Sequence, residues 1–257
     1  MALHLSHAIS DGLRRTLSKT GGILFIGLLI VQIGTQAAVN TAVSSYLPAG
    51  LTTQAGLTAG LGLPVSGAGA LAIFAALVIL SAAFFVIIAR TMIQPQDKIS
   101  TIPVDATRRL GRTTLAMLIG GILVSVSVFV GTLFFILPGL FLATSFLFIV
   151  FTIAVEDRGV IDGLKRSWGL ASGSRLKLFA LVVLTTVFGG VIGGIAPLLD
   201  YGGIPVASEA IVAVVTAAFL TPYYGILAAS YLQLRDEQRG VDRRSTEPAD
   251  ASGTPEL

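Results

Sequence analysis

The sequence predicts an all-α fold, a polytopic transmembrane helical bundle of six spans with inner interfacial amphipathic helices. Of its 257 residues, 54% are hydrophobic and 12% are charged, whereas an average soluble domain is about 25% charged. Long uncharged apolar segments recur along the chain, and a membrane-spanning helix needs roughly 20 apolar residues. These two observations indicate a membrane protein, and the placement of the basic residues, described below, supports six spans.

The first 19 residues are predicted to form a cytoplasmic amphipathic segment. Leu5, Ile9, Leu13 and Leu17 recur every four residues, which places them on one face of a helix lying in the membrane interface. The alternative is a frayed N-terminus. The apolar run that follows is longer than the 7–15 residues of a signal peptide, so we expect an uncleaved first span.

The transmembrane domain is expected over residues 20–235, followed by a disordered cytoplasmic tail over 236–257, where charged, Pro, Ser and Thr residues show no periodicity. The segment 47–67 is predicted to be an outer loop, with a shallow re-entrant excursion as the alternative. Leu137-Pro138-Gly139 is predicted to form a tight turn. The six spans are predicted at about 21–46, 68–93, 113–136, 140–155, 175–197 and 208–233.

The basic residues predict the topology. All 17 Lys and Arg residues lie in the N-terminal segment, the 90–112 region, the 158–177 region or the C-terminal part. The predicted outer loops contain none. Because basic residues mark the cytoplasmic side, we expect a multi-pass protein of the cell membrane with both termini in the cytoplasm.

A pattern Asp-x-x-basic-Arg occurs three times, beginning at Asp11, Asp105 and Asp162. Each copy lies a few residues before a predicted span that runs outward. One interpretation is a duplicated unit of two spans. The other is convergence, because any inner juxtamembrane helix benefits from a capping Asp and from basic residues.

The third copy is a candidate cytoplasmic interface, formed by Asp162, Lys165, Arg166 and Trp168. The segment 160–172 is predicted to be an interfacial helix, with Ile161, Leu164 and Trp168 on its apolar face. Tryptophan is enriched at headgroup depth, and basic side chains there attract anionic headgroups. The more economical interpretation is a topological anchor.

The first span carries a candidate polar cavity, formed by Gln32, Gln36 and Asn40. Their spacing of four places the three amides on one face of a helix. Amides facing lipid are costly, so this face should point into the bundle. One interpretation is hydrogen bonding between helices, and the other is a cavity for a ligand or headgroup.

No catalytic constellation is found, and no cofactor or metal is expected. His4 and His7 form a His-x-x-His pattern that is weak as a metal motif, and the chain has no cysteine. The interiors of the spans lack Asp, Glu, Lys and Arg, which argues against proton-coupled transport. Gly189, Gly190, Gly193 and Gly194 match the small-residue spacing for close helix contact.

The sequence resembles a family of uncharacterised prokaryotic multi-pass membrane proteins related to the membrane domain of glycerophosphodiester phosphodiesterases. The resemblance is carried by Pro138-Gly139, Glu156-Asp157, Lys165-Arg166-Ser167-Trp168 and Gly173. It covers about residues 137–185 well and the rest in architecture. The catalytic barrel domain of those enzymes is absent, so the resemblance implies a helical membrane protein and assigns no catalytic residue.

Two functions are therefore expected as alternatives. The first is a non-enzymatic membrane scaffold that interacts with membrane lipids, including anionic headgroups, or with a protein partner. The second is a permease or lipid-handling transporter with a polar cavity on the first span. The net charge of +3 is no nucleic-acid signal, because the basic residues flank apolar runs, and the sequence does not identify a protein partner.

Overall fold

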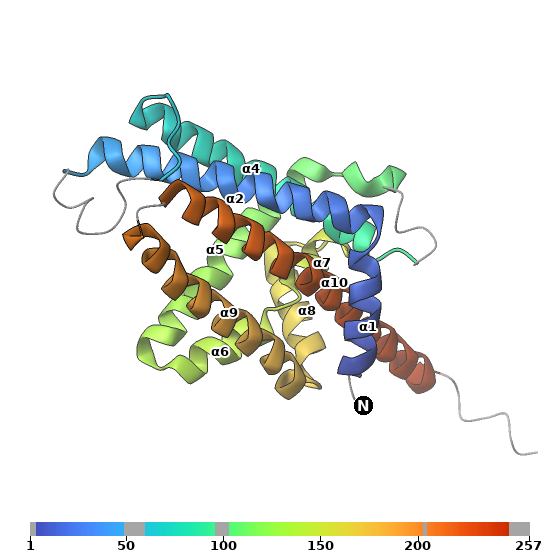
Figure 1. Cartoon of the computed structure of the whole chain (residues 1–257). Helices are drawn as coiled ribbons and strands as arrows, with labels where there is room; N and C mark the ends of the chain where they lie inside the picture. The colour runs from blue at the N-terminus through green and yellow to red at the C-terminus, as the bar shows by residue number, and fades with distance from the viewer. Residues whose placement is uncertain (1–3, 49–59, 96–102, 203–204, 247–257) are drawn as a thin grey trace, which may run out of the picture.

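The computed structural model describes residues 4–48, 60–95, 103–202 and 205–246. All regular structure within these ranges is helical, which confirms the all-α class (Figure 1). Six segments of the described chain are long and apolar enough to cross a membrane. The elements are α1 (Leu5–Thr16), α2 (Lys19–Tyr46), α4 (Gly67–Met92), the 3₁₀ helix η1 (Val104–Thr107), α5 (Leu110–Phe134), α6 (Ile136–Ser145), α7 (Ile149–Ala154), α8 (Val160–Ser172), α9 (Arg175–Tyr201) and α10 (Pro205–Thr246).

The helices α2, α4, α5 and α8 begin and end within a few residues of the predicted bounds. The last two spans are longer than expected. Helix α9 continues through Pro197 to Tyr201, and α10 continues to Thr246. The predicted disordered tail over 236–257 therefore begins with helix up to residue 246, and residues 247–257 lie outside the described ranges.

Tertiary packing reaches the part of α10 beyond the predicted span. Helix α1 lies beside α10 (Figure 1), and the backbone N–H of His4 donates to Gln233 Oε1 at 3.3 Å. Farther along α10, Gln238 accepts from Arg166 of α8 at 2.6 Å and donates to the Gly169 carbonyl at 3.3 Å. The two ends of the described chain therefore lie at the same end of the bundle. We call this end, where Arg90, Arg109 and Arg158 also lie, the basic end.

Helices α1 and α10 pack through glycine. A Cβ atom at Gly12 would collide with the backbone of Gly225 and Ile226, so only glycine allows this approach. The predicted stripe faces the other way: Ile9, Leu13 and Leu17 are 41%, 46% and 88% exposed. An outward apolar face is compatible with the predicted interfacial position.

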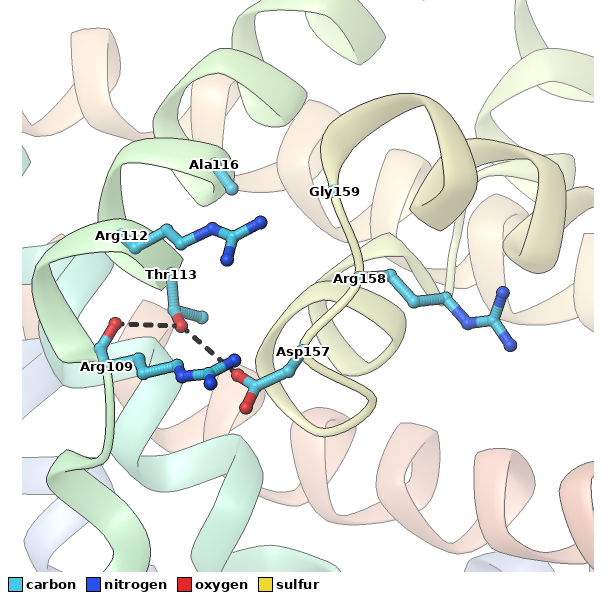
Figure 2. A pocket seen from close by; sticks show the side chains of 7 residues that line it. All are labelled: Arg109, Arg112, Thr113, Ala116, Asp157, Arg158 and Gly159. Carbon is cyan, nitrogen blue, oxygen red and sulfur yellow. Dashed lines mark hydrogen bonds between the residues drawn. The ribbon is translucent and has the colours of Figure 1, made fainter.

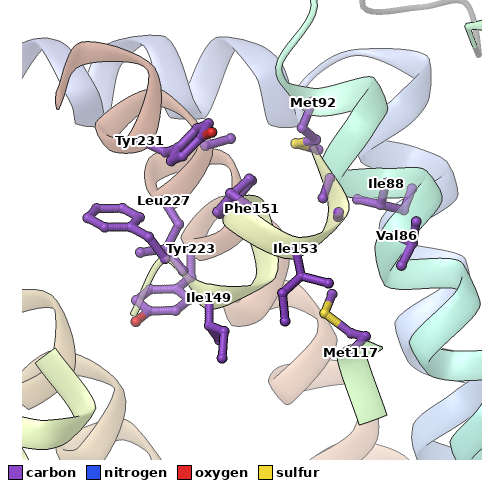
Figure 3. Close-up of a cluster of buried hydrophobic side chains, with 14 of the residues drawn as sticks. Val86, Ile88, Met92, Met117, Ile149, Phe151, Ile153, Tyr223, Leu227 and Tyr231 are labelled. Carbon is purple, nitrogen blue, oxygen red and sulfur yellow. The ribbon is translucent and has the colours of Figure 1, made fainter. Parts of the chain in front are cut away.

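The hydrophobic core gathers around α7, in the middle of the bundle (Figure 3). Phe148, Ile153 and Tyr231 are almost completely buried. Figure 3 shows Phe151 of α7 beside Tyr231 of α10, and their rings stack with centroids 5.2 Å apart. The core therefore joins the short α7 to α4, α5, α8 and α10.

The fourth predicted span is not one continuous helix. Helix α6 ends at Ser145 and α7 begins at Ile149. A break in the helix frees backbone groups that cannot be left unpaired in a membrane. Ser167 of α8 pairs two of them, because its hydroxyl accepts from the Phe148 N–H at 3.2 Å and donates to the Ser145 carbonyl at 3.0 Å.

The glycine pairs of the fifth span do not pack as predicted. A Cβ atom at Gly189, Gly190, Gly193 or Gly194 would meet nothing within 4 Å. The second half of α9 is also apolar and exposed, with Val187 and Val191 more than half exposed. The expected close helix contact is therefore absent from the described part of this chain.

Candidate functional site

The site is built around the turn between α7 and α8 at the basic end. Asp157 in this turn has a positive φ of 51°, and Arg109 before α5 has a φ of 49°. Few residues other than glycine adopt this left-handed region, and Asp is one of those enriched in it. The turn directs Glu156 and Asp157 to different partners, as described next, so they do not form a carboxylate pair.

Arg90, near the end of α4, holds this turn in place. Its guanidinium donates to the carbonyls of Ala154 at 2.7 Å, Ala106 at 2.9 Å and Arg108 at 2.6 Å. It also pairs with Asp157 Oδ1 at 2.9 Å. The five N–H donors of arginine suit this task, and they join the ends of α7 and η1 to α4.

Arg15 of α1 pairs with free backbone carbonyls at the C-terminal end of α4. Its side chain is buried and donates to the carbonyl of Met92, and to that of Gln94 at 2.9 Å. A cation at a helix C-terminus satisfies free carbonyls and opposes the helix dipole. Burial lowers the pKa of Arg15 from its ordinary value, and the nearby Asp11 opposes this effect.

Three arginines line a pocket beside the turn (Figure 2). Arg109 and Arg112 come from the start of α5, and Arg158 comes from the α7–α8 turn. Arg158 pairs with Glu156 at 2.6 Å, and Asp157 is already paired with Arg90. Arg109 and Arg112 are exposed, and their guanidinium groups form no hydrogen bond or ion pair with the described residues.

The start of α5 adds to the positive potential of this pocket. Arg109 occupies the N-cap position of α5, and no side chain caps the helix there. Free N–H groups at a helix N-terminus favour anions. Two unpaired guanidinium groups next to an uncapped helix N-terminus are therefore suited to bind a phosphate or another oxyanion.

Glu156 forms a second polar group on the other side of the turn. It accepts from the Tyr231 hydroxyl at 2.9 Å and pairs with Arg158 at 2.6 Å and Arg166 at 3.3 Å. Burial alone would raise the pKa of Glu156. The hydrogen bonds from Tyr231 and Arg158 and the charge of Arg166 outweigh it, so that the pKa is below its ordinary value of 4.5.

The predicted interface residues of α8 do not share one surface. Asp162 and Lys165 are exposed, whereas Arg166 turns inward and donates to Gln238 Oε1 at 2.6 Å. Asp162 lies in the first turn of the helix without capping it, because Gly159 is the N-cap. Whether these residues recognise a partner stays a prediction.

Trp168 takes part in an aromatic cluster. Its ring lies 5.5 Å from Phe141 and 5.8 Å from Phe146, measured between centroids. The guanidinium of Arg175 lies 4.8 Å from the Phe141 ring and 4.7 Å from the Trp168 ring, which is cation–π distance. Trp168 is 37% exposed, so one part of the ring remains accessible.

The amides of the first span lie toward the opposite end of the bundle. The side chain of Asn40 donates to Glu209 Oε1 at 2.7 Å and to the Leu61 carbonyl at 3.2 Å. Gln36 donates to Asn40 Oδ1 at 3.3 Å. The side chain of Gln32 is half-buried and forms no hydrogen bond with the described residues, so the structure joins two of the three amides.

Glu209 was not singled out from the sequence, because it lies near the start of the last span and away from any motif. Its second oxygen accepts from the Leu61 N–H at 2.6 Å. Gly60 leaves the space that this carboxylate occupies. The network joins α2, the segment before α4 and α10, as expected for hydrogen bonding between helices, while a ligand cavity at these amides stays a prediction.

Arg90 and Arg112 were also missed as site residues. Only Arg109 carried a usable signal, as the final residue of the second Asp-x-x-basic-Arg copy. Arg112 lies three residues later, in the first turn of α5. Among the described residues no group of three or more His, Asp and Glu side chains could hold a metal ion.

Comparison with known proteins gives one match. A family model described as "Domain of unknown function (DUF7847)" matches residues 3–234. Neither the curated proteins nor the solved structures include a match. The relation to the membrane domain of glycerophosphodiester phosphodiesterases therefore stays a prediction. Because the match covers most of the chain, the protein belongs to the DUF7847 family.

Proposed function

We propose that this protein is a non-enzymatic integral membrane protein that binds anionic phospholipid headgroups at its basic end. The observation that carries the proposal is the arginine pocket. Arg109 and Arg112 are exposed and unpaired among the described residues, and they lie at the uncapped start of α5. A headgroup phosphate supplies the acceptor oxygens that two guanidinium groups and free N–H groups require.

The position of the pocket supports a lipid as the source of the phosphate. Arg109 and Arg112 immediately precede and begin a helix long enough to cross a membrane. Juxtamembrane basic residues contribute about 1 kcal/mol each near an anionic surface. The resemblance to the membrane domain of glycerophosphodiester phosphodiesterases fits a role at headgroups, and transport through the first span is kept as the alternative.

The test compares two phospholipids with identical chains. The purified full-length protein would be mixed with equal amounts of dioleoylphosphatidylglycerol and dioleoylphosphatidylcholine, and retained lipid would be counted by native mass spectrometry. We expect the wild type to retain more phosphatidylglycerol than phosphatidylcholine. The ratio of the two retained lipids should fall by about thirtyfold in Arg109→Gln/Arg112→Gln, which corresponds to two charges of about 1 kcal/mol each.

The control removes the same charge elsewhere at the basic end. Arg14 and Lys19 are also exposed but do not line the pocket, so Arg14→Gln/Lys19→Gln should keep the preference. A wild-type protein without preference, or a pocket variant that keeps it, would contradict the proposal. Displacement of phosphatidylglycerol by inorganic phosphate at equal concentration would identify a soluble anion as the ligand instead.

A further inference from the structure

A second feature lies between α4 and α5. It is an apolar cavity, open on one side, with a volume of about 210 Å³. Val78 and Phe85 of α4 line one wall, and Met117 and Gly121 of α5 line the other. Ile153 of α7 and Tyr224 of α10 also line it. All four helices belong to segments that are long and apolar enough to cross a membrane.

Two adjacent glycines of α5 at this site have different surroundings. A Cβ atom at Gly120 would lie 3.0 Å from a side-chain carbon of Ile153, so α5 packs tightly on α7 there. A Cβ atom at Gly121 would meet nothing within 4 Å. Gly121 therefore leaves a gap on the side of α5 that lines the cavity.

Water is a poor occupant of this cavity. Among the lining side chains only Ser81 and Tyr224 carry polar atoms, and the Ser81 hydroxyl donates to the carbonyl of Val78 at 2.8 Å. A buried water usually makes about three hydrogen bonds, and this lining offers few polar partners. An apolar ligand of several carbon atoms therefore suits the space.

The exposed residues next to the cavity, and its distance from Arg112 along α5, indicate the kind of apolar ligand. Next to the cavity, Ile79 is 54% and Ile122 is 65% exposed, as expected for residues facing lipid. Gly121 lies nine residues beyond Arg112, which corresponds to about 13 Å along the helix. This places the cavity below the headgroup layer and in the hydrocarbon region, where acyl chains are the available apolar groups.

We propose that this cavity holds one acyl chain of a membrane lipid. The inference concerns the chain and not the headgroup, so it goes beyond the proposed function and stands independently of it. A narrow space between two helices suits a linear chain. A chain that lies in the cavity would make van der Waals contacts with its apolar lining.

The test is photo-crosslinking in the membrane. The full-length protein would be reconstituted with phosphatidylcholine that carries a diazirine in the middle of one chain, and adducts would be mapped by peptide mass spectrometry. We expect the adducts to concentrate on residues 78–85, 117–121 and Tyr224. The same pattern should appear with phosphatidylglycerol of the same chains.

Filling the cavity should abolish these adducts. Gly121→Leu should reduce them by about tenfold, the loss expected for two buried methylene groups. Gly189→Leu makes the same change at a glycine that also has open space around it, and should leave the adducts unchanged. Ser81→Leu fills the cavity from the opposite wall, and decides the question if Gly121→Leu does not fold.

The outcomes separate this inference from the headgroup proposal. Adducts spread evenly over the exposed faces of α5 and α9, or unchanged in both filling variants, would overturn the chain site. Equal adducts with both headgroups and no headgroup preference by mass spectrometry would contradict the proposed function alone. Loss of the adducts in the filling variants would support the chain site in either case.

Discussion

The segment Asp162–Trp168, which we call the motif, contains the third Asp-x-x-basic-Arg copy. Ser167 shows how one residue of this motif contributes to the fold. Its hydroxyl is completely buried and bridges the break between α6 and α7. Gly163, one turn earlier, lets α8 approach α7 closely, and its carbonyl accepts from Thr152 at 3.1 Å. The motif therefore supports the broken fourth span, in addition to its predicted anchoring role.

Ser167→Ala is expected to destabilise the protein by about 1–3 kcal/mol. The change leaves the Phe148 N–H and the Ser145 carbonyl buried without their partner, and each unpaired group carries a desolvation penalty of that size. Thermal unfolding in detergent measures the effect. Ser172→Ala, on the exposed side of the same helix, is the control and should leave the melting temperature nearly unchanged.

Glu156 should make stability depend on pH. Because its pKa in the folded protein is below its ordinary value of 4.5, the unfolded chain binds the proton more readily. The stabilisation is therefore complete above about pH 4.5 and decreases as the pH falls through the lowered pKa. Melting temperatures recorded across this range should fall for the wild type and fall less steeply for Glu156→Gln.

Asp162 provides the comparison for this pH series. It is exposed and forms no ion pair with the described residues. Asp162→Asn should therefore follow the wild-type curve as the pH falls. If Glu156→Gln follows that curve too, the contacts with Tyr231, Arg158 and Arg166 do not stabilise the charged carboxylate.

At the scale of elements, the apolar pattern predicted where the helices lie better than it predicted which faces of them pack together. The leucine and isoleucine stripe predicted an amphipathic α1, yet the face that packs on α10 is the opposite one, with Ala8, Gly12 and Arg15 buried. The reason is that this contact uses the absence of a side chain at Gly12. Hydrophobic periodicity carries no signal for such a contact, and the same applies to Gly163 of α8.

The α1–α10 contact predicts opposite effects for two glycine substitutions. In a helix, Gly→Ala ordinarily stabilises by about 0.5–1 kcal/mol. Gly22 of α2 has open space around it, so Gly22→Ala should raise the melting temperature. Gly12→Ala should lower it, because the new methyl group would collide with the backbone of α10.

A parallel readout tests whether α1 is displaced. Limited proteolysis near the N-terminus should become faster in Gly12→Ala and remain unchanged in Gly22→Ala. Stabilisation by both substitutions would show that α1 does not rest on α10 in the protein. The two variants differ only in position, so a general effect of alanine on helices cannot produce opposite signs.

At the scale of the whole molecule, the positions of the spans followed from the sequence because each requires a long apolar run. The break in the fourth span did not, because Phe146, Leu147 and Phe148 are apolar and continue the pattern. The helical start of the predicted tail was missed because Gln238 bonds to Arg166 and Gly169 of α8, which lie far from it in the sequence. The arginine pocket joins Arg112 and Arg158, which are 46 positions apart in the sequence, and no local pattern predicts that.

The orientation in the membrane can be tested because the chain has no cysteine, so single cysteines can be labelled without background. Ser6 and Ser172 are exposed toward the basic end, in α1 and at the end of α8, and Val65 is exposed just before α4. With six spans, Ser6→Cys and Ser172→Cys should react from the same side. Val65→Cys should react from the other.

In intact cells, an impermeant maleimide should label Val65→Cys alone, because basic residues are retained on the cytoplasmic side. Lysis should then expose Ser6→Cys and Ser172→Cys. Labelling of Ser6→Cys in intact cells would reverse the predicted orientation and would place the arginine pocket at the outer surface. Labelling of Ser6→Cys and Ser172→Cys from opposite sides would instead contradict the six-span arrangement, since an odd number of crossings would have to separate them.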